Sequence, residues 1–170
     1  MERTIPGEQG EQRKYDDPLH TMLVNTLYDQ PHMAGFYDVS QPMKELEFDD
    51  GSQDPKSFDL AFLCNIHSEP ILVECKTGIT SGVRKKAIRK VEAHARKFMG
   101  INNLESCKLA VCMFNQTGKM AKYSARLVLT EKGIDYIRNS ENGHAWEENQ
   151  FDVPDELLEL YQLKYNRTLN

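Results

Sequence analysis

Asp59, Glu74 and Lys76 are the residues whose types and spacing are best suited to chemistry. Asp59 lies in the apolar segment 58–64, and Glu74 and Lys76 lie in the apolar segment 71–78. Both segments are short and bounded by turn residues, which predicts two β-strands. Because burying an unpaired charge is expensive, each of these side chains needs a partner, a metal ion or a cleft.

The geometry of a strand brings the three charges together. Side chains alternate between the two faces of a strand, so Glu74 and Lys76 share a face, roughly 6.6 Å apart, while Cys75 faces the core. If the two strands pair antiparallel across the turn at 65–70, Asp59 lies opposite the end of the second strand. Two carboxylates in one patch suit Mg²⁺ or Mn²⁺, and a neighbouring lysine can orient water or stabilise negative charge.

This pattern resembles a known nuclease superfamily. Asp59, fourteen residues and then Glu74-Cys75-Lys76 resemble the core of the PD-(D/E)xK, or restriction-endonuclease-like, nucleases, with Phe58 in place of the proline. The ending Glu-Cys-Lys-Thr-Gly, a basic helix and a further apolar strand are most similar to the nuclease domains of CRISPR ancillary nucleases. The resemblance covers about residues 45–115.

The resemblance implies a fold and an activity. The expected fold is α/β, with a central mixed β-sheet flanked by helices in a restriction-endonuclease-like core. The expected activity is metal-dependent hydrolysis of DNA or RNA in antiviral defence, with an activating partner or effector. Asp59, Glu74 and the backbone carbonyl of Cys75 would hold Mg²⁺ or Mn²⁺, and Lys76 would position or deprotonate the attacking water. A glutamate of the first helix often joins such sites, and Glu11 or Glu8 would take that place if the helix begins early.

The remaining elements follow from periodicity and from turn residues. Asp17-Pro18 predicts a helix start, and an apolar stripe from Leu19 runs to Asp29. The other expected elements are edge strands at 36–39 and 44–48, a helix at 83–99 capped by Ser81 or Gly82 and ended by Gly100, and a buried strand at 108–114. Residues 120–132 could hold a strand around 126–129, but a helix stopped by Gly133 is preferred. A short strand at 134–137 and a helix that begins near 152–154 complete the expected elements.

The helix at 83–99 carries a basic face. Between Arg84 and Lys97 there are seven Lys or Arg residues and one Glu, so this segment carries +6 and the rest of the chain −11. Segregated charge of this kind indicates phosphate binding, although a solvated amphipathic helix has the same pattern. The predicted nucleic-acid contacts are Lys85, Lys86, Arg89 and Lys90, whereas His94 is interpreted as a surface residue.

Composition favours one globular domain over residues 1–170, with 1–14 as a flexible arm and 141–170 as an acidic helical extension. The chain contains no apolar run of the roughly 20 residues that a membrane span needs, so we expect a cytoplasmic protein without a membrane partner. The four cysteines, at 64, 75, 107 and 112, are interpreted as reduced core residues rather than zinc ligands or disulfides. Trp146 is expected to be partly buried against the domain.

Two alternatives to the enzyme remain. The first is a catalytically inactive nuclease-like fold that serves as a nucleic-acid-binding or assembly module, which the acidic C-terminal segment favours. The second is an interaction protein without a site, which gives no account of Glu74 and Lys76 inside a buried strand. Since duplex cleavage by one small site usually needs two copies, the enzyme is expected to be a homodimer.

Overall fold

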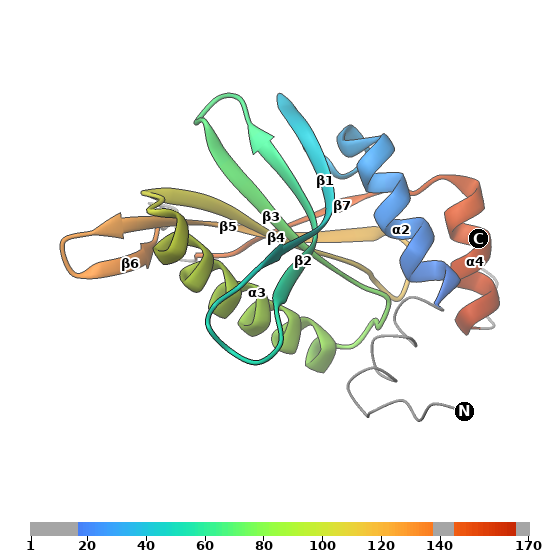
Figure 1. Cartoon of the computed structure of the whole chain (residues 1–170). Helices are drawn as coiled ribbons and strands as arrows, with labels where there is room; N and C mark the ends of the chain where they lie inside the picture. The colour runs from blue at the N-terminus through green and yellow to red at the C-terminus, as the bar shows by residue number, and fades with distance from the viewer. Residues whose placement is uncertain (1–16, 138–144, 166–170) are drawn as a thin grey trace.

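The computed structural model describes residues 17–137 and 145–165, which form a seven-stranded mixed β-sheet flanked by helices (Figure 1). In chain order the elements are α2 (Pro18–Asp29), the 3₁₀ helix η1 (Pro31–Ala34), β1 (Val39–Phe48), β2 (Lys56–Cys64), β3 (Glu69–Lys76), α3 (Ser81–Asn102), β4 (Ser106–Phe114), β5 (Met120–Thr130), β6 (Gly133–Tyr136), β7 (Glu147–Phe151) and α4 (Asp155–Tyr165). The predicted α/β class and mixed sheet are confirmed.

The sheet has the order β1-β2-β3-β4-β5-β6, and β7 also pairs with β5. Strands β1, β2 and β3 form an antiparallel meander, as their short turns require. Strand β4 is parallel to β3, and the long α3 makes the connection between them. The remaining pairs are antiparallel, so only the β3–β4 pair at the centre is parallel.

Helices α2 and α4 cover one face of the sheet and α3 covers the other (Figure 1). The first core contains Leu23, Leu27, Leu60, Val73, Phe114 and Tyr161, and the second contains Phe58, Leu72, Val91, Ala95, Leu109 and Met99. Central strands buried on both faces read as continuous apolar runs, and β3 and β4 have that pattern. The charged residues of β3 therefore stand out as exceptions.

The predicted cap of the first helix is confirmed, and the predicted ends of the long helix are wrong. Asp17 caps α2, accepting a hydrogen bond from the Leu19 amide at 3.0 Å. Helix α3 is capped by Thr80, whose hydroxyl accepts from the Val83 amide at 3.2 Å. It continues past Gly100 to Asn102, because Asn103 adopts the left-handed conformation that ends a helix.

The cap assignment makes a prediction for Thr80→Ala. Losing the hydroxyl leaves an amide of the first turn without its acceptor, which lowers the free energy of unfolding by about 1 kcal/mol. We expect a fall of about 2–4 °C in Tm for a chain of this size, measured by circular dichroism. The control is Ser81→Ala, since Ser81 is exposed and its side chain does not cap the helix. A larger loss in Ser81→Ala than in Thr80→Ala would contradict this assignment.

Residues 120–130 form strand β5, so the predicted helix there is wrong. The segment pairs with β4 along most of its length, from Phe114 opposite Met120 to Ser106 opposite Val128. Apolar and polar side chains alternate along it, with Ala121, Tyr123 and Leu127 on the α3 face and Lys122, Ser124 and Arg126 on the other. The apolar spacing also fitted a helix, and sheet pairing on both edges decided between the two.

Three further boundaries differ from the predictions. Gly133 does not stop a helix; it begins β6 with φ +123°, directly after the β5–β6 turn. Only Val39 of the predicted strand 36–39 is extended in the sheet, as the first residue of β1. The acidic C-terminal segment contains strand β7 as well as α4, so it belongs in part to the sheet. The predicted arm at 1–14 lies outside the described residues.

The predicted core position of the four cysteines is confirmed, since all four are buried, and they are free thiols. Burial raises the pKa of Cys107 and Cys112 to about 12, so these side chains stay protonated in the core. Trp146 is partly buried and packs edge-on against Tyr136, as expected. Among the residues that the structure describes, no helix is long and apolar enough to cross a membrane.

Candidate functional site

Asp59 links the start of β2 to the end of β3. Leu60 is paired with Val73, so the register places Asp59 beside the last residues of β3. The Cys75 amide donates to Asp59 Oδ2 at 2.8 Å, and the carboxylate is buried. The structure thus brings Asp59 next to the Glu74-Cys75-Lys76 segment.

Glu74 is buried under two lysines. Its side chain is 2% exposed, and Oε2 lies 2.9 Å from Lys90 Nζ and 3.3 Å from Lys76 Nζ. Glu74 and Lys76 are two residues apart in β3 and share the face that α3 covers, where Lys90 reaches them. Both lysines remain partly exposed, so the cluster reaches solvent through its cations and not through its carboxylate.

Sequence reasoning missed His20, which lies on α2 beside Asp59. His20 Nε2 is 3.5 Å from Asp59 Oδ2 and is buried without a hydrogen-bond partner among the described residues. A signal was present in the sequence. His20 falls on the apolar stripe with Leu23, Val24 and Leu27, and a polar residue inside such a stripe needs a reason. The family resemblance pointed only to glutamates in the first helix.

A pocket of about 440 Å³ opens at the end of β3, between the first turns of α2 and α3. Its lining includes Asp17, His20, Cys75, Lys76, Thr77, Gly78, Val83 and Lys86. A Cβ atom on Gly78 would lie 2.8 Å from Val83 Cγ2, so only glycine allows the loop to pass this close to α3. The pocket gives solvent access to Lys76 and His20, the side chains that flank the buried Glu74 and Asp59.

Asp17 connects three elements at the rim of this pocket. Its Oδ2 accepts from Thr77 Oγ1 at 2.9 Å and from Lys164 Nζ at 2.8 Å, which joins α2 to the loop after β3 and to α4. Partial burial raises the pKa of Asp17, but the hydrogen bonds and charge of Lys164 and Thr77 outweigh it and hold the pKa below 3.8. The depressed pKa means that ionised Asp17 stabilises the fold.

Lys164→Met is therefore expected to destabilise the protein in a pH-dependent way. Because the folded-state pKa of Asp17 is depressed, its contribution is present above the unfolded value of 3.8 and is lost as the pH falls through the folded value. Near neutral pH we expect a loss of about 1 kcal/mol in urea unfolding, and the difference from wild type should shrink as the pH falls below 3.8.

The control for this pair is Lys119→Met. Lys119 pairs with Asp152 at 3.5 Å, but both side chains are more than half exposed, so the change should be small at every pH. A loss in Lys164→Met that is the same at neutral and acid pH would contradict the role given to Asp17.

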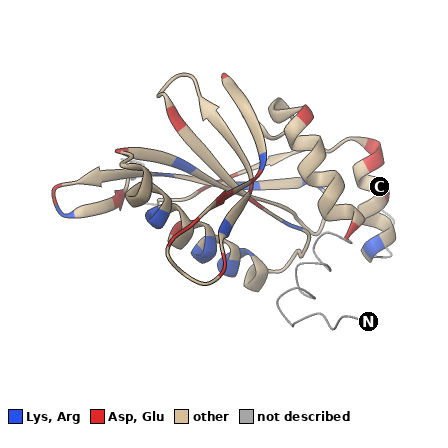
Figure 2. Ribbon diagram, viewed as in Figure 1, with Lys and Arg blue, Asp and Glu red and all other residues tan. Residues whose placement is uncertain are grey.

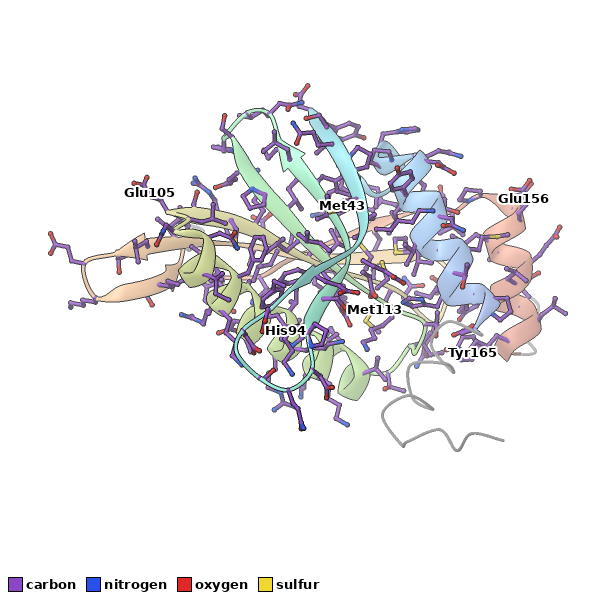
Figure 3. The ribbon with its side chains drawn as sticks, in the orientation of Figure 1. Met43, His94, Glu105, Met113, Glu156 and Tyr165 are labelled. Carbon is purple, nitrogen blue, oxygen red and sulfur yellow. The ribbon has the colours of Figure 1, made fainter. Side chains whose placement is uncertain are left out.

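The basic face of α3 is present as predicted, and its members differ in their surroundings (Figure 2). Lys85, Lys86 and Arg89 are exposed, whereas Lys90 is engaged with Glu74. His94 is not a surface residue: it is half-buried, 6.0 Å from the Phe48 ring and 6.2 Å from the Phe58 ring (Figure 3). Burial lowers its pKa. Glu11 and Glu8 lie outside the described residues.

No family model matches the chain, and the search of curated proteins finds no relative. Within residues 17–137 and 145–165, no group of three His, Cys, Asp or Glu side chains is arranged to hold a metal ion. The candidate site therefore rests on the local geometry where the start of β2 lies beside the end of β3.

Proposed function

We propose that the chain is a metal-dependent nuclease with a restriction-endonuclease-like core, whose active site lies where β2 and β3 separate. The observation that carries the proposal is the hydrogen bond from the Cys75 amide to Asp59. It joins the isolated aspartate to the Glu-Cys-Lys segment across two strands. The order helix, antiparallel meander, helix and parallel strand supports the same core.

The donors around Asp59 fit a divalent cation. A strand residue that donates its amide towards one neighbour presents its carbonyl to the same side, so the Cys75 carbonyl points towards β2, the strand that carries Asp59. The buried His20 Nε2 is a third donor, beside Asp59 Oδ2. The carboxylate and carbonyl oxygens suit Mg²⁺ and Mn²⁺, whereas an imidazole nitrogen is a ligand for transition metals rather than for Mg²⁺. Glu74 precedes Cys75 in β3. A bound divalent cation would activate water and stabilise the leaving oxygen.

Lys76 is the side chain that acts on the substrate in this proposal. Its ammonium lies at the pocket, 3.3 Å from Glu74, with about a third of the side chain exposed. In that position it can orient or deprotonate water and offset charge that develops on the phosphate. Glu74 fixes the ammonium in place through their ion pair, and Lys90 supports Glu74 from α3.

The exposed cations at the start of α3 fit a nucleic-acid substrate. Lys86 lines the same pocket as Lys76, and Lys85 and Arg89 are exposed on the same helix. A phosphodiester at Lys76 would place the adjacent backbone phosphates along this face. A DNA or RNA substrate is a prediction from the sequence. The homodimer and the activating partner or effector are also predictions from the sequence.

One observation favours a binding module without hydrolysis. Two lysines at 2.9 and 3.3 Å neutralise Glu74, so Asp59, Glu74, Lys76 and Lys90 together carry no net charge without a metal ion. A site that is already neutral attracts a divalent cation less strongly than a pair of free carboxylates does. In this alternative the lysines hold a phosphate and nothing is cut.

The test is a cleavage panel on the full chain. Supercoiled plasmid, single-stranded DNA and single-stranded RNA are incubated with Mg²⁺, Mn²⁺ or EDTA, for wild type and Glu74→Gln. The nuclease predicts cutting that needs a metal ion and is lost in Glu74→Gln. Binding that weakens steeply with salt, with no cutting in any metal, would favour the binding module instead. The absence of both would contradict each proposal.

A further inference from the structure

A second pocket lies on the face of the sheet that α2 and α4 cover, beyond the reach of those helices. Its volume is about 330 Å³, at the lower end of the range of ligand sites, which is about 300–1,000 Å³. Its floor is formed by β4 and β5, and its walls come from the segment after η1 and from the β2–β3 turn. The pocket of the proposed nuclease contains none of these residues.

Lys122 of β5 is the central residue of this pocket. The residue is 8% exposed, and its ammonium lies 4.4 Å from the centre of the Phe36 ring and 5.4 Å from that of Phe151. In the part of the chain that the structure describes, no carboxylate lies within ion-pair distance of it. Burial lowers the pKa of Lys122. Two aromatic rings compensate a desolvated ammonium only in part, so the site favours an added anion.

The other charges around Lys122 leave the pocket cationic. Lys108 on β4 lines the pocket, and its charge disfavours protonation of Lys122. Arg126 is engaged by the buried Glu69 at 2.9 Å, which satisfies that pair internally. Glu147 also lines the pocket, and its charge favours the charged form of Lys122. Beyond the Arg126–Glu69 pair, the described lining thus carries the ammonium groups of Lys122 and Lys108 and the carboxylate of Glu147.

The rim of the pocket is apolar and exposed. Tyr37 and Ile66 are each 67% exposed and Ile137 is 45% exposed, and all three line the pocket. They make up a large part of the bulky apolar surface that the described residues leave in water. An apolar rim above a cationic floor is complementary to a molecule that has an anionic group and an apolar body.

We propose that this pocket binds a small organic anion, a phosphate monoester or a carboxylate, with its charged group on Lys122 and its apolar body against Tyr37, Ile66 and Ile137. Lys108 assists as a second cation. A Cβ atom on Gly35 would lie 2.7 Å from Phe151 Cζ and 3.3 Å from Lys122 Nζ, so glycine at this position lets both side chains pack against the backbone at the pocket wall. This inference does not depend on the proposed nuclease activity.

The experiment is calorimetric titration of the full chain with phenyl phosphate, benzoate, inorganic phosphate and phenol at constant ionic strength. Wild type should bind phenyl phosphate or benzoate, and the stronger of the two identifies the anionic group. Lys122→Met should weaken that binding about tenfold or more, because it removes a charge-assisted hydrogen bond and keeps the apolar bulk. Ile66→Ser should weaken the binding of phenyl phosphate but leave the binding of inorganic phosphate unchanged.

The control variant is Lys119→Met, whose lysine is exposed on the β4–β5 turn and lies outside the pocket. Thermal unfolding of Lys122→Met checks folding, and its Tm should equal or exceed that of wild type because an uncompensated buried charge is removed. The proposal is overturned if neither organic anion binds at millimolar concentration, or if Lys122→Met binds the organic anions as tightly as wild type does. It is also overturned if phenol or inorganic phosphate binds wild type as tightly as the organic anions do.

Discussion

Lys76→Met is expected to reduce the rate of metal-dependent cleavage by about 10²–10³-fold, the effect of removing one preorganised charge donor from a transition state. Methionine keeps the length of the side chain and removes its charge, so Glu74 remains covered while the phosphate loses its cation. Single-turnover rates on the substrate identified by the cleavage panel measure the chemical step without product release. Substrate affinity should change far less than the rate.

The matched control is Lys132→Met in the β5–β6 turn. Lys76 is aligned with Met113 of β4, which is aligned with Ala121 of β5. Lys132 follows Thr130 at the other end of β5. About nine strand residues, or roughly 30 Å, therefore separate the two lysines. The cleavage rate of Lys132→Met should match that of wild type. Equal rates in Lys76→Met and Lys132→Met would remove Lys76 from the mechanism, even if cleavage itself depended on a metal ion.

Tyr161→Ala is expected to lower the free energy of unfolding by about 4 kcal/mol, which corresponds to about 8–16 °C in Tm. Tyr161 on α4 is fully buried, its ring lies 5.0 Å from that of Phe114, and its hydroxyl donates to the Asn115 carbonyl at 3.1 Å. Truncation leaves a cavity between α4 and the centre of the sheet. Thermal and urea unfolding measure the loss.

Two companion variants separate the contributions at this position. Tyr161→Phe removes only the hydroxyl and should lose about 1 kcal/mol. Leu163→Ala, two residues along the same helix, changes a side chain that is 78% exposed and should lose less than about 0.5 kcal/mol. If Tyr161→Ala were as stable as Leu163→Ala, the C-terminal segment would be an appendage and not part of the core.

The sequence predicted the elements whose signals are local. Asp17 and Pro18 marked the start of α2, and the turn at 65–70 between two apolar runs predicted the antiparallel β2–β3 pair. The helix predicted within 120–132 was wrong, because Ala121, Ala125 and Val128 fit a helix as well as a strand. Only the pairing of β5 with β4 on one edge and with β6 and β7 on the other decides between the two.

For the candidate site too, the sequence predicted only what depends on local pattern. Alternation along β3 placed Glu74 and Lys76 on one face, and the structure has them there. The approach of His20 to Asp59 and of Lys90 to Glu74 depends on how α2 and α3 pack on the sheet, which no short-range pattern specifies. The pocket at Lys122 was not predicted, because Lys122, Ser124 and Arg126 lie on one face only if residues 120–130 form a strand.

The division of the β5 edge between β7 and β6 has a consequence for local opening. Residues 120–124 of β5 pair with β7 beside the core, and residues 127–130 pair with the short β6. Amide protons of the β6 hairpin should exchange with solvent through opening of that hairpin alone. Amide protons of residues 120–124, which pair with β7, should exchange only through global unfolding. The hairpin tip at Glu131 and Lys132 is therefore a place to insert a reporter peptide without disturbing either pocket.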